Sequence, residues 1–112
     1  MSKNLKMSVL LDFYGDILTD NQREAMDMFY NGDYSLAEIS EEVGITRQGV
    51  RERLLKSEKT LSGLEEKLGL ADKFTDMQKD VSELISMLEE LQRETGRDMT
   101  ALIGIAERIR DR

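Results

Sequence analysis

The sequence SLAEISEEVGITRQGVRERL, residues 35–54, decides the fold of this chain. Ser35 and Glu38 form a capping-box pattern, in which a hydroxyl and a carboxylate each satisfy a backbone N–H at the start of a helix. Gly44 supplies a residue that tolerates a positive φ, and Thr46 caps a second helix after a turn of three residues. The stretch therefore predicts two helices joined by a tight turn.

The apolar residues of this stretch occupy the positions that such a unit must bury. Ser40 is small where the two helices cross closely, and Ile45 follows the turn and fills the space beneath it. The residues expected to face inward are Leu36, Ile39, Val43, Val50 and Leu54. All these positions are filled at the right spacing, so we predict a helix-turn-helix unit at about residues 35–57.

The exposed side chains of the second helix form a candidate DNA-binding site. A helix-turn-helix unit places the N-terminal half of its second helix in the major groove. Arginine can pair with guanine and glutamine with adenine, whereas basic side chains further along and the capping hydroxyls suit phosphates. The candidate residues are Ser35, Thr46, Arg47, Gln48, Arg51, Glu52, Arg53 and Lys56. The alternative is a three-helix scaffold on which these side chains are only a solvated face.

Composition excludes several classes of function. The 112 residues contain no cysteine and no histidine, which removes disulfides, thiolate chemistry and the commonest general base and metal ligand. The acidic residues Asp76, Asp80 and Glu83 have helical spacing and suit a solvated face better than a metal site. We therefore expect no enzyme activity, no cofactor and no bound metal. No apolar run approaches a membrane span or a signal peptide, so we expect a cytoplasmic protein.

Charge is distributed unevenly along the chain, whose net charge is −7. Residues 46–60 carry five basic and two acidic side chains, a net charge of +3. Residues 61–95 carry four basic and nine acidic side chains, a net charge of −5. The total argues against general nucleic-acid binding, while the short basic stripe favours it locally.

The whole chain is predicted to be all-α. Proline is absent, and strong helix formers dominate a sequence without strand-like alternation. The expected helices cover about residues 4–14, 19–30, 36–43, 47–68, 73–94 and 100–110. The apolar face of the helix over residues 47–68 is expected to comprise Val50, Leu54, Leu61, Leu64 and Leu68. We divide the chain into a helix-turn-helix domain, residues 1–70, and a C-terminal helical extension, residues 71–112.

The extension contains a heptad pattern over nearly three heptads. Its apolar residues, at spacings of three and four, are Phe74, Met77, Val81, Leu84, Leu88 and Leu91. These side chains either pack back on the rest of the chain or form a seam with a partner. A homodimer is the simplest partner arrangement, and it would suit DNA binding because two recognition helices then meet two half-sites.

Several motifs resemble a known family. The motifs are LTDNQ (residues 18–22), SLAEI (35–39) and GITRQGV (44–50), which resemble region 4 of bacterial sigma factors, and LDFYG (11–15). Together they resemble the YlxM-like family of small helix-turn-helix proteins over about residues 4–70. The resemblance implies a bacterial cytosolic protein, recognition-helix roles for Arg47, Gln48 and Arg51, and a regulatory or accessory role in the signal recognition particle pathway. Family members usually carry alanine in place of Gly49.

The sequence is compatible with three functions. The leading hypothesis is a regulatory protein that binds DNA. The second is an interaction module that contacts RNA or a protein of the signal recognition particle, with the acidic extension docking a basic partner. The third is a helical adaptor that binds no nucleic acid.

Overall fold

The structure is a computed structural model that describes residues 5–111, and no strand occurs among them. The elements are α1 (Leu5–Tyr14), η1 (Gly15–Ile17), α2 (Asp20–Met26), η2 (Asp27–Asn31), α3 (Leu36–Val43), α4 (Arg47–Leu68), α5 (Leu70–Thr95) and α6 (Thr100–Arg110). The predicted all-α class is confirmed. The elements form two compact units, of which the N-terminal unit ends at Ala71 and the C-terminal unit begins at Asp72.

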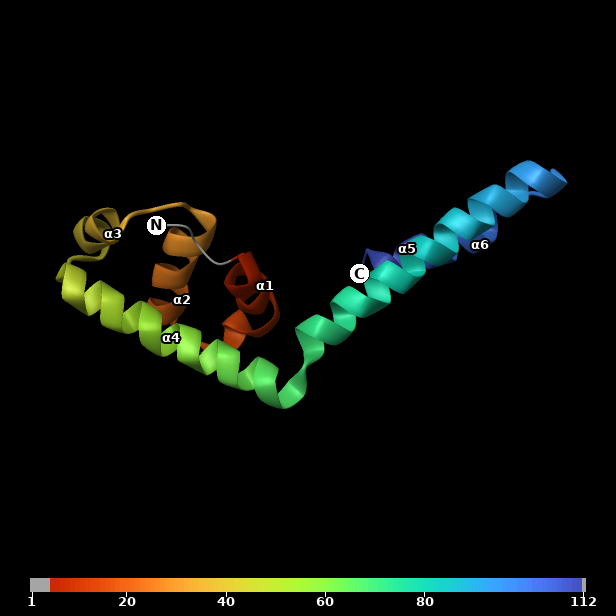
Figure 1. Ribbon diagram of the computed structural model, residues 1–112. Helices are drawn as coiled ribbons and strands as arrows, with labels where there is room; N and C mark the ends of the chain where they lie inside the picture. The colour runs from red at the N-terminus through yellow and green to blue at the C-terminus, as the bar shows by residue number, and fades with distance from the viewer. Residues whose placement is uncertain (1–4, 112) are drawn as a thin grey trace. The chain divides into compact units, whose positions relative to one another are not determined.

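Helix α4 is the central helix of the N-terminal unit. Helices α1, α2 and α3 all pack against it, as Figure 1 shows for the green helix and its red-to-yellow neighbours. Ile39, Val50 and Leu61 are completely buried in the shared core. Burying such aliphatic side chains contributes about 1.5–3 kcal/mol each, so the packing on α4 holds the helix-turn-helix in place.

The inward face of α4 differs from the prediction at its C-terminal end. Leu68 was expected to be buried but is 49% exposed, whereas Ser57 and Glu65 are buried. Ser57 donates its hydroxyl hydrogen to the Arg53 carbonyl oxygen (2.8 Å), which satisfies it without another element. The buried face therefore continues along α4 through two polar positions that an apolar pattern does not identify.

Glu65 belongs to a buried polar network at the end of the N-terminal unit. Its Oε1 accepts hydrogen bonds from the Tyr14 hydroxyl (2.7 Å) and from the Ala71 backbone N–H (3.1 Å). The Tyr14 oxygen in turn accepts the Leu70 N–H at 3.2 Å. Burial and the hydrogen bond to Glu65 raise the pKa of Tyr14 above its ordinary value. The network satisfies the first two N–H groups of α5, which follows directly after Gly69 with its left-handed φ of 61°.

The segment between α2 and α3 contains a wide turn. Helix α2 continues into η2, a π-helical turn in which the Gly32 N–H donates to the Asp27 carbonyl oxygen at 2.9 Å. The turn places Phe29 in the core, and the Tyr30 hydroxyl donates to Glu58 on α4. The hydrogen bond from Tyr30 to Glu58 therefore joins the segment before α3 to α4, in addition to the core packing of Phe29.

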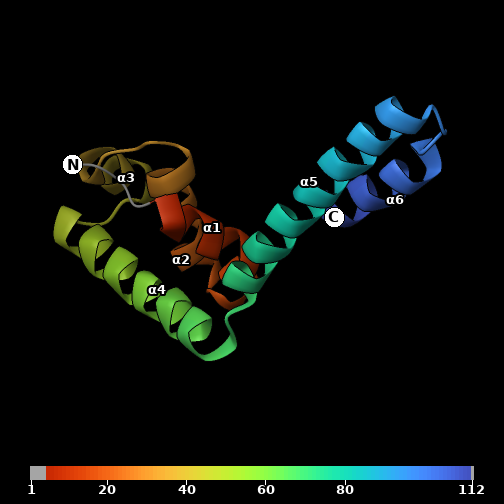
Figure 2. The ribbon, with the colours of Figure 1, turned by 45° about the vertical axis from the view of Figure 1, so that its right-hand side comes forward.

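The C-terminal unit is a hairpin of two helices, in which α6 runs back along α5 (Figure 2). Side-chain amides fix its register: Gln78 Nε2 donates to the Arg110 carbonyl oxygen (3.2 Å) and Gln92 Oε1 accepts the Met99 N–H (2.8 Å). Ile85 and Ala106 are the buried residues between the helices. Ile85 lies outside the predicted heptad positions, but it follows Val81 by four residues and precedes Leu88 by three, and both of these are half-buried. The contact with α6 therefore uses one edge of the predicted heptad face together with Ile85 beside it.

Candidate nucleic-acid interface

The turn of the helix-turn-helix is fixed by backbone and side-chain bonds. Gly44 ends α3 with a left-handed φ of 74°, and its N–H donates to the Ser40 carbonyl oxygen (3.0 Å). The Ser40 hydroxyl donates to the carbonyl oxygen of Ile45. The predicted positive φ at Gly44 is confirmed, and Ser40 bonds the turn as well as allowing the close crossing. These contacts set the direction in which α4 begins.

Both helices begin with the predicted side-chain caps. Ser35 Oγ accepts the Glu38 N–H (3.1 Å), while Glu38 Oε1 accepts the Ser35 N–H (3.0 Å). Thr46 Oγ1 accepts the Gly49 N–H (3.0 Å) at the start of α4. Each capping hydroxyl accepts one backbone hydrogen and can still donate its own to a phosphate oxygen.

Gly49 lies beneath the α4 cap. A Cβ atom at this position would be 3.2 Å from Thr46 Oγ1 and 3.5 Å from Ile45 Cδ1. An alanine would therefore require the Thr46 hydroxyl to move by a few tenths of an ångström. The glycine leaves the cap undisturbed at some cost in helix propensity.

The predicted base-contacting residues share one exposed side of α4. Arg47, Gln48, Arg51 and Glu52 are all exposed, and Gln48 Nε2 lies 3.4 Å from Glu52 Oε1. Residues three and four apart on a helix are neighbours, so these four side chains form a continuous polar ridge. The opposite side of this part of α4 carries Val50 and Leu54, which are buried in the core.

The other predicted contacts flank this ridge. Ser35, Thr46 and Lys56 are exposed, whereas Arg53 is half-buried. Leu55 is 54% exposed one turn after Arg51, and sequence reasoning missed it because only polar positions were considered. An exposed leucine beside such a ridge offers apolar contact, which in a major groove means the thymine methyl group.

Charge around the ridge depends on where the acidic side chains point. Residues 35–60 contain five basic and five acidic side chains, so this stretch as a whole has no net charge. Glu58 is engaged by Tyr30, whose pKa is raised by burial and by this hydrogen bond. Glu41 and Glu42 are exposed on α3 rather than on α4. The outer side of α4 is therefore locally basic, with an acidic helix beside it.

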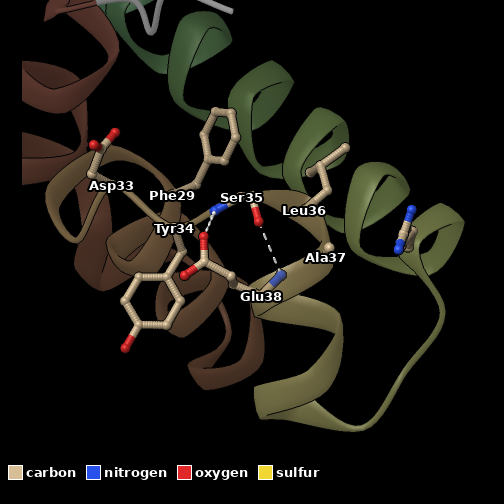
Figure 3. A pocket seen from close by; sticks show the side chains of 8 residues that line it. Phe29, Asp33, Tyr34, Ser35, Leu36, Ala37 and Glu38 are labelled. Atoms are coloured by element: carbon tan, nitrogen blue, oxygen red, sulfur yellow. Dashed lines mark hydrogen bonds between the residues drawn. The ribbon is translucent and has the colours of Figure 1, made fainter.

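A pocket opens between the start of α3 and the first residue of α4 (Figure 3). It is lined by Phe29, Asp33, Tyr34, Ser35, Leu36, Ala37, Glu38 and Arg47. Figure 3 shows the Ser35–Glu38 capping box at its wall, beside the ring of Tyr34. Asp33 turns the chain into this wall with a φ of 58°, a conformation that aspartate tolerates better than most residues. The pocket combines aromatic carbon with one arginine and two carboxylates, a composition that disfavours a free anion.

Two other kinds of site are absent from the described part of the chain. Within residues 5–111 no group of three or more acidic side chains is arranged to hold a metal ion. None of the helices there is long and apolar enough to cross a membrane.

The architecture and the exposed ridge define the class: this is a helix-turn-helix protein. Residues 1–102 match the family described as "Putative helix-turn-helix protein, YlxM / p13 like". The chain belongs to this family, which confirms the resemblance seen in the sequence.

Relatives from several bacteria are similar to the chain over most of its length. A UPF0122 protein of Caldanaerobacter subterraneus subsp. tengcongensis is 50% identical over 80 residues, covering 71% of this chain and 68% of the relative. One from Thermoanaerobacter sp. strain X514 is 43% identical over 107 residues, covering 96% of this chain and 91% of the relative. One from Bacillus velezensis is 37% identical over 109 residues, with 97% of both chains covered.

Proposed function

We propose that the protein is a DNA-binding regulator whose α4 ridge enters the major groove. The observation that carries the proposal is the exposed row of Arg47, Gln48 and Arg51 on the first turns of a helix whose start is fixed by Gly44 and Thr46. Arginine and glutamine donate bidentate hydrogen bonds to guanine and adenine edges. Lys56 and the capping hydroxyls of Ser35 and Thr46 are placed at the margins of the ridge, where phosphates would lie.

The charge distribution also sets how strongly DNA would be bound. With Glu41 and Glu42 exposed on α3 and a chain charge of −7, phosphates would be attracted only by the few basic side chains of α4 around the ridge, such as Lys56. Few phosphate contacts mean weak affinity and a modest slope of affinity against salt concentration. Binding should therefore be measured first at low salt, on DNA from the protein's own promoter and on random duplexes.

A fluorescence-anisotropy titration with three variants tests the proposal. Arg47→Ala and Arg51→Ala should each weaken DNA binding by about 5- to 150-fold if they contact bases. Arg93→Ala, an exposed arginine of α5, is the matched control and should leave affinity unchanged. Absence of binding at low salt, or equal losses in all three variants, would contradict the proposal.

A second candidate function is contact with a protein or RNA of the signal recognition particle pathway. The net charge of −7 favours a protein partner, because a basic protein would be attracted where DNA and RNA are not. A pull-down from native cells should then recover the particle's GTPase or its RNA. Arg47→Ala/Arg51→Ala should retain partner binding under this hypothesis if the C-terminal helices carry it, and recovery of neither component would count against it.

A further inference from the structure

The C-terminal unit has a very small interior for its size. Residues 72–111 form the α5–α6 hairpin, and among them Ile85 and Ala106 are the buried residues. Domains of about 40 residues or fewer usually need disulfides, metals or oligomerisation to be stable. The chain has no cysteine, and residues 5–111 hold no cluster of metal ligands. Association with another chain is a way to stabilise the hairpin that needs neither a disulfide nor a metal.

One face of the hairpin is apolar and open. A groove along it is lined entirely by apolar residues of both helices, namely Leu84, Leu88, Leu102, Ile105, Ala106 and Ile109. Leu84 is 49% exposed and Leu102 is 51% exposed. Met87 and Leu91 extend the same face, because they follow Leu84 at helical spacing and are also exposed. We call this surface the hairpin face.

The area of the hairpin face matches what a dimer needs. Six large side chains on it are 42–61% exposed, and they leave on the order of 600 Å² of apolar surface open per chain. Two such faces together would bury on the order of 1,200 Å², which reaches the lower bound for specific, stable interfaces. A two-fold axis would bring each face against an identical one, so complementarity needs no second kind of chain.

Charges beside the hairpin face favour one way of pairing. Acidic residues recur at helical spacing along the α5 flank next to the face: Asp76, Asp80, Glu83, Glu90 and Glu94. On α6 the corresponding flank carries Arg108 and no acidic residue. Placing two α5 helices flank to flank would oppose like charges, whereas placing each α5 beside the partner's α6 avoids this and brings arginine toward carboxylates.

We propose that two copies of the chain associate through the hairpin face to form an antiparallel four-helix bundle. The seam then comprises residues from both α5 and α6, whereas the half-buried heptad positions Phe74 and Val81 lie on the side of α5 that carries Ile85. The α4 ridge takes no part in it. The proposal is independent of DNA binding, because the mass of the protein is measured without DNA.

Light scattering after size-exclusion chromatography tests the proposal on the full chain. The native protein should have twice the 12.9 kDa mass of one chain. Leu84→Glu and Ile105→Glu should each weaken association by more than about 100-fold and give monomers. Each substitution would bury two carboxylates in the interface, one from each copy of the chain. Ile17→Glu, at an exposed apolar residue of the N-terminal unit, is the matched control and should stay dimeric.

A second measurement needs no substitution. Hairpin unfolding followed by circular dichroism should shift to a higher temperature as protein concentration rises, because dimerisation stabilises the folded state by mass action. All three tyrosines precede residue 72, so their fluorescence follows the N-terminal unit separately. A native monomer at about 100 µM, a concentration-independent transition, or dissociation by Ile17→Glu but not by Ile105→Glu would overturn the proposal.

Discussion

Replacing Glu65 by alanine should destabilise the N-terminal unit by about 3 kcal/mol. The substitution leaves the Tyr14 hydroxyl and the Ala71 N–H, both buried, without the oxygen that accepts their hydrogen bonds. Each buried neutral group that loses its partner costs about 1–3 kcal/mol. Lost side-chain packing adds to this, while removing a buried carboxylate returns part of its desolvation cost. Glu65→Gln keeps an acceptor oxygen and should cost only about 1 kcal/mol.

Urea unfolding followed by tyrosine fluorescence measures this change in one unit. The tyrosines lie at positions 14, 30 and 34 and the chain has no tryptophan, so the signal reports the N-terminal unit alone. With a urea dependence of about 1 kcal/mol per molar, Glu65→Ala should lower the midpoint by about 3 M. Total stabilities of small domains are about 5–15 kcal/mol, so this loss would be a large fraction.

Glu66→Ala is the matched control for this experiment. Glu66 is the next residue on α4 and is exposed, so its loss should change stability by less than about 0.5 kcal/mol. If the Glu65→Ala midpoint equals that of Glu66→Ala, the network contributes nothing. If it lies above the native value, desolvation of the buried carboxylate outweighs its hydrogen bonds, and the reasoning is refuted.

Three further predictions concern glycines, pH and salt. Gly63→Ala should stabilise the N-terminal unit by about 1 kcal/mol in urea unfolding, because the added Cβ meets open space within α4. Gly32→Ala should cost about 1–3 kcal/mol, because the added Cβ would lie 3.0 Å from the Met28 carbonyl oxygen. Changes in unfolding free energy of the same sign for both variants would contradict this. Burial and the Glu58 hydrogen bond raise the pKa of Tyr30 in the folded state, whereas unfolding frees this phenol to ionise near pH 10. Unfolding should therefore become easier as pH rises above about 10. Tyr30→Phe should reduce that dependence and leave the part that Tyr14 contributes, and an unchanged slope would refute it. Lys56→Ala should lower the slope of log affinity for DNA against log salt by about 1, without altering base preference.

The helix-turn-helix was predictable because local and tertiary signals agree there. The capping box at Ser35, the positive φ at Gly44 and the inward spacing of Ile39, Val50 and Leu54 are all present as expected. Each signal reports a physical requirement that the chain itself satisfies within a few residues. The exposure of the α4 ridge follows directly, since the apolar face determines which face remains outside.

Polar residues in the core were not predictable from apolar spacing. Ser57 and Glu65 are buried because their hydrogen-bond partners are in place, and two of those partners, Tyr14 and Ala71, lie 51 and 6 residues away from Glu65 in the sequence. Hydrophobic periodicity contains no information about such partners.

The heptad pattern indicated an apolar side of α5 but not how that side is divided. Ile85, outside the heptad positions, packs toward α6, while Leu84 and Leu91 remain largely exposed. The division depends on where α6 returns, and the bonds of Gln78 and Gln92 help to fix that position. A period of three and four residues cannot distinguish an internal contact from one with a second chain.

The wide turn of η2 makes the number of residues in this segment as important as their identity. A π turn contains one residue more than the α-helical turn it replaces, and each residue rotates the chain by about 100°. Deleting Asp27 or Met28 would turn Phe29 and Tyr30 away from the contacts they make in the core and with Glu58. Asp27 and Asn31 are exposed, and Asn31 accepts a hydrogen bond from the Ser8 hydroxyl (2.9 Å) and donates one to Asp27 Oδ1 (3.0 Å). These two positions should accept replacements that keep a hydrogen-bonding side chain. Variation among functional sequences at this point should therefore be substitutional, with insertions and deletions confined to other loops.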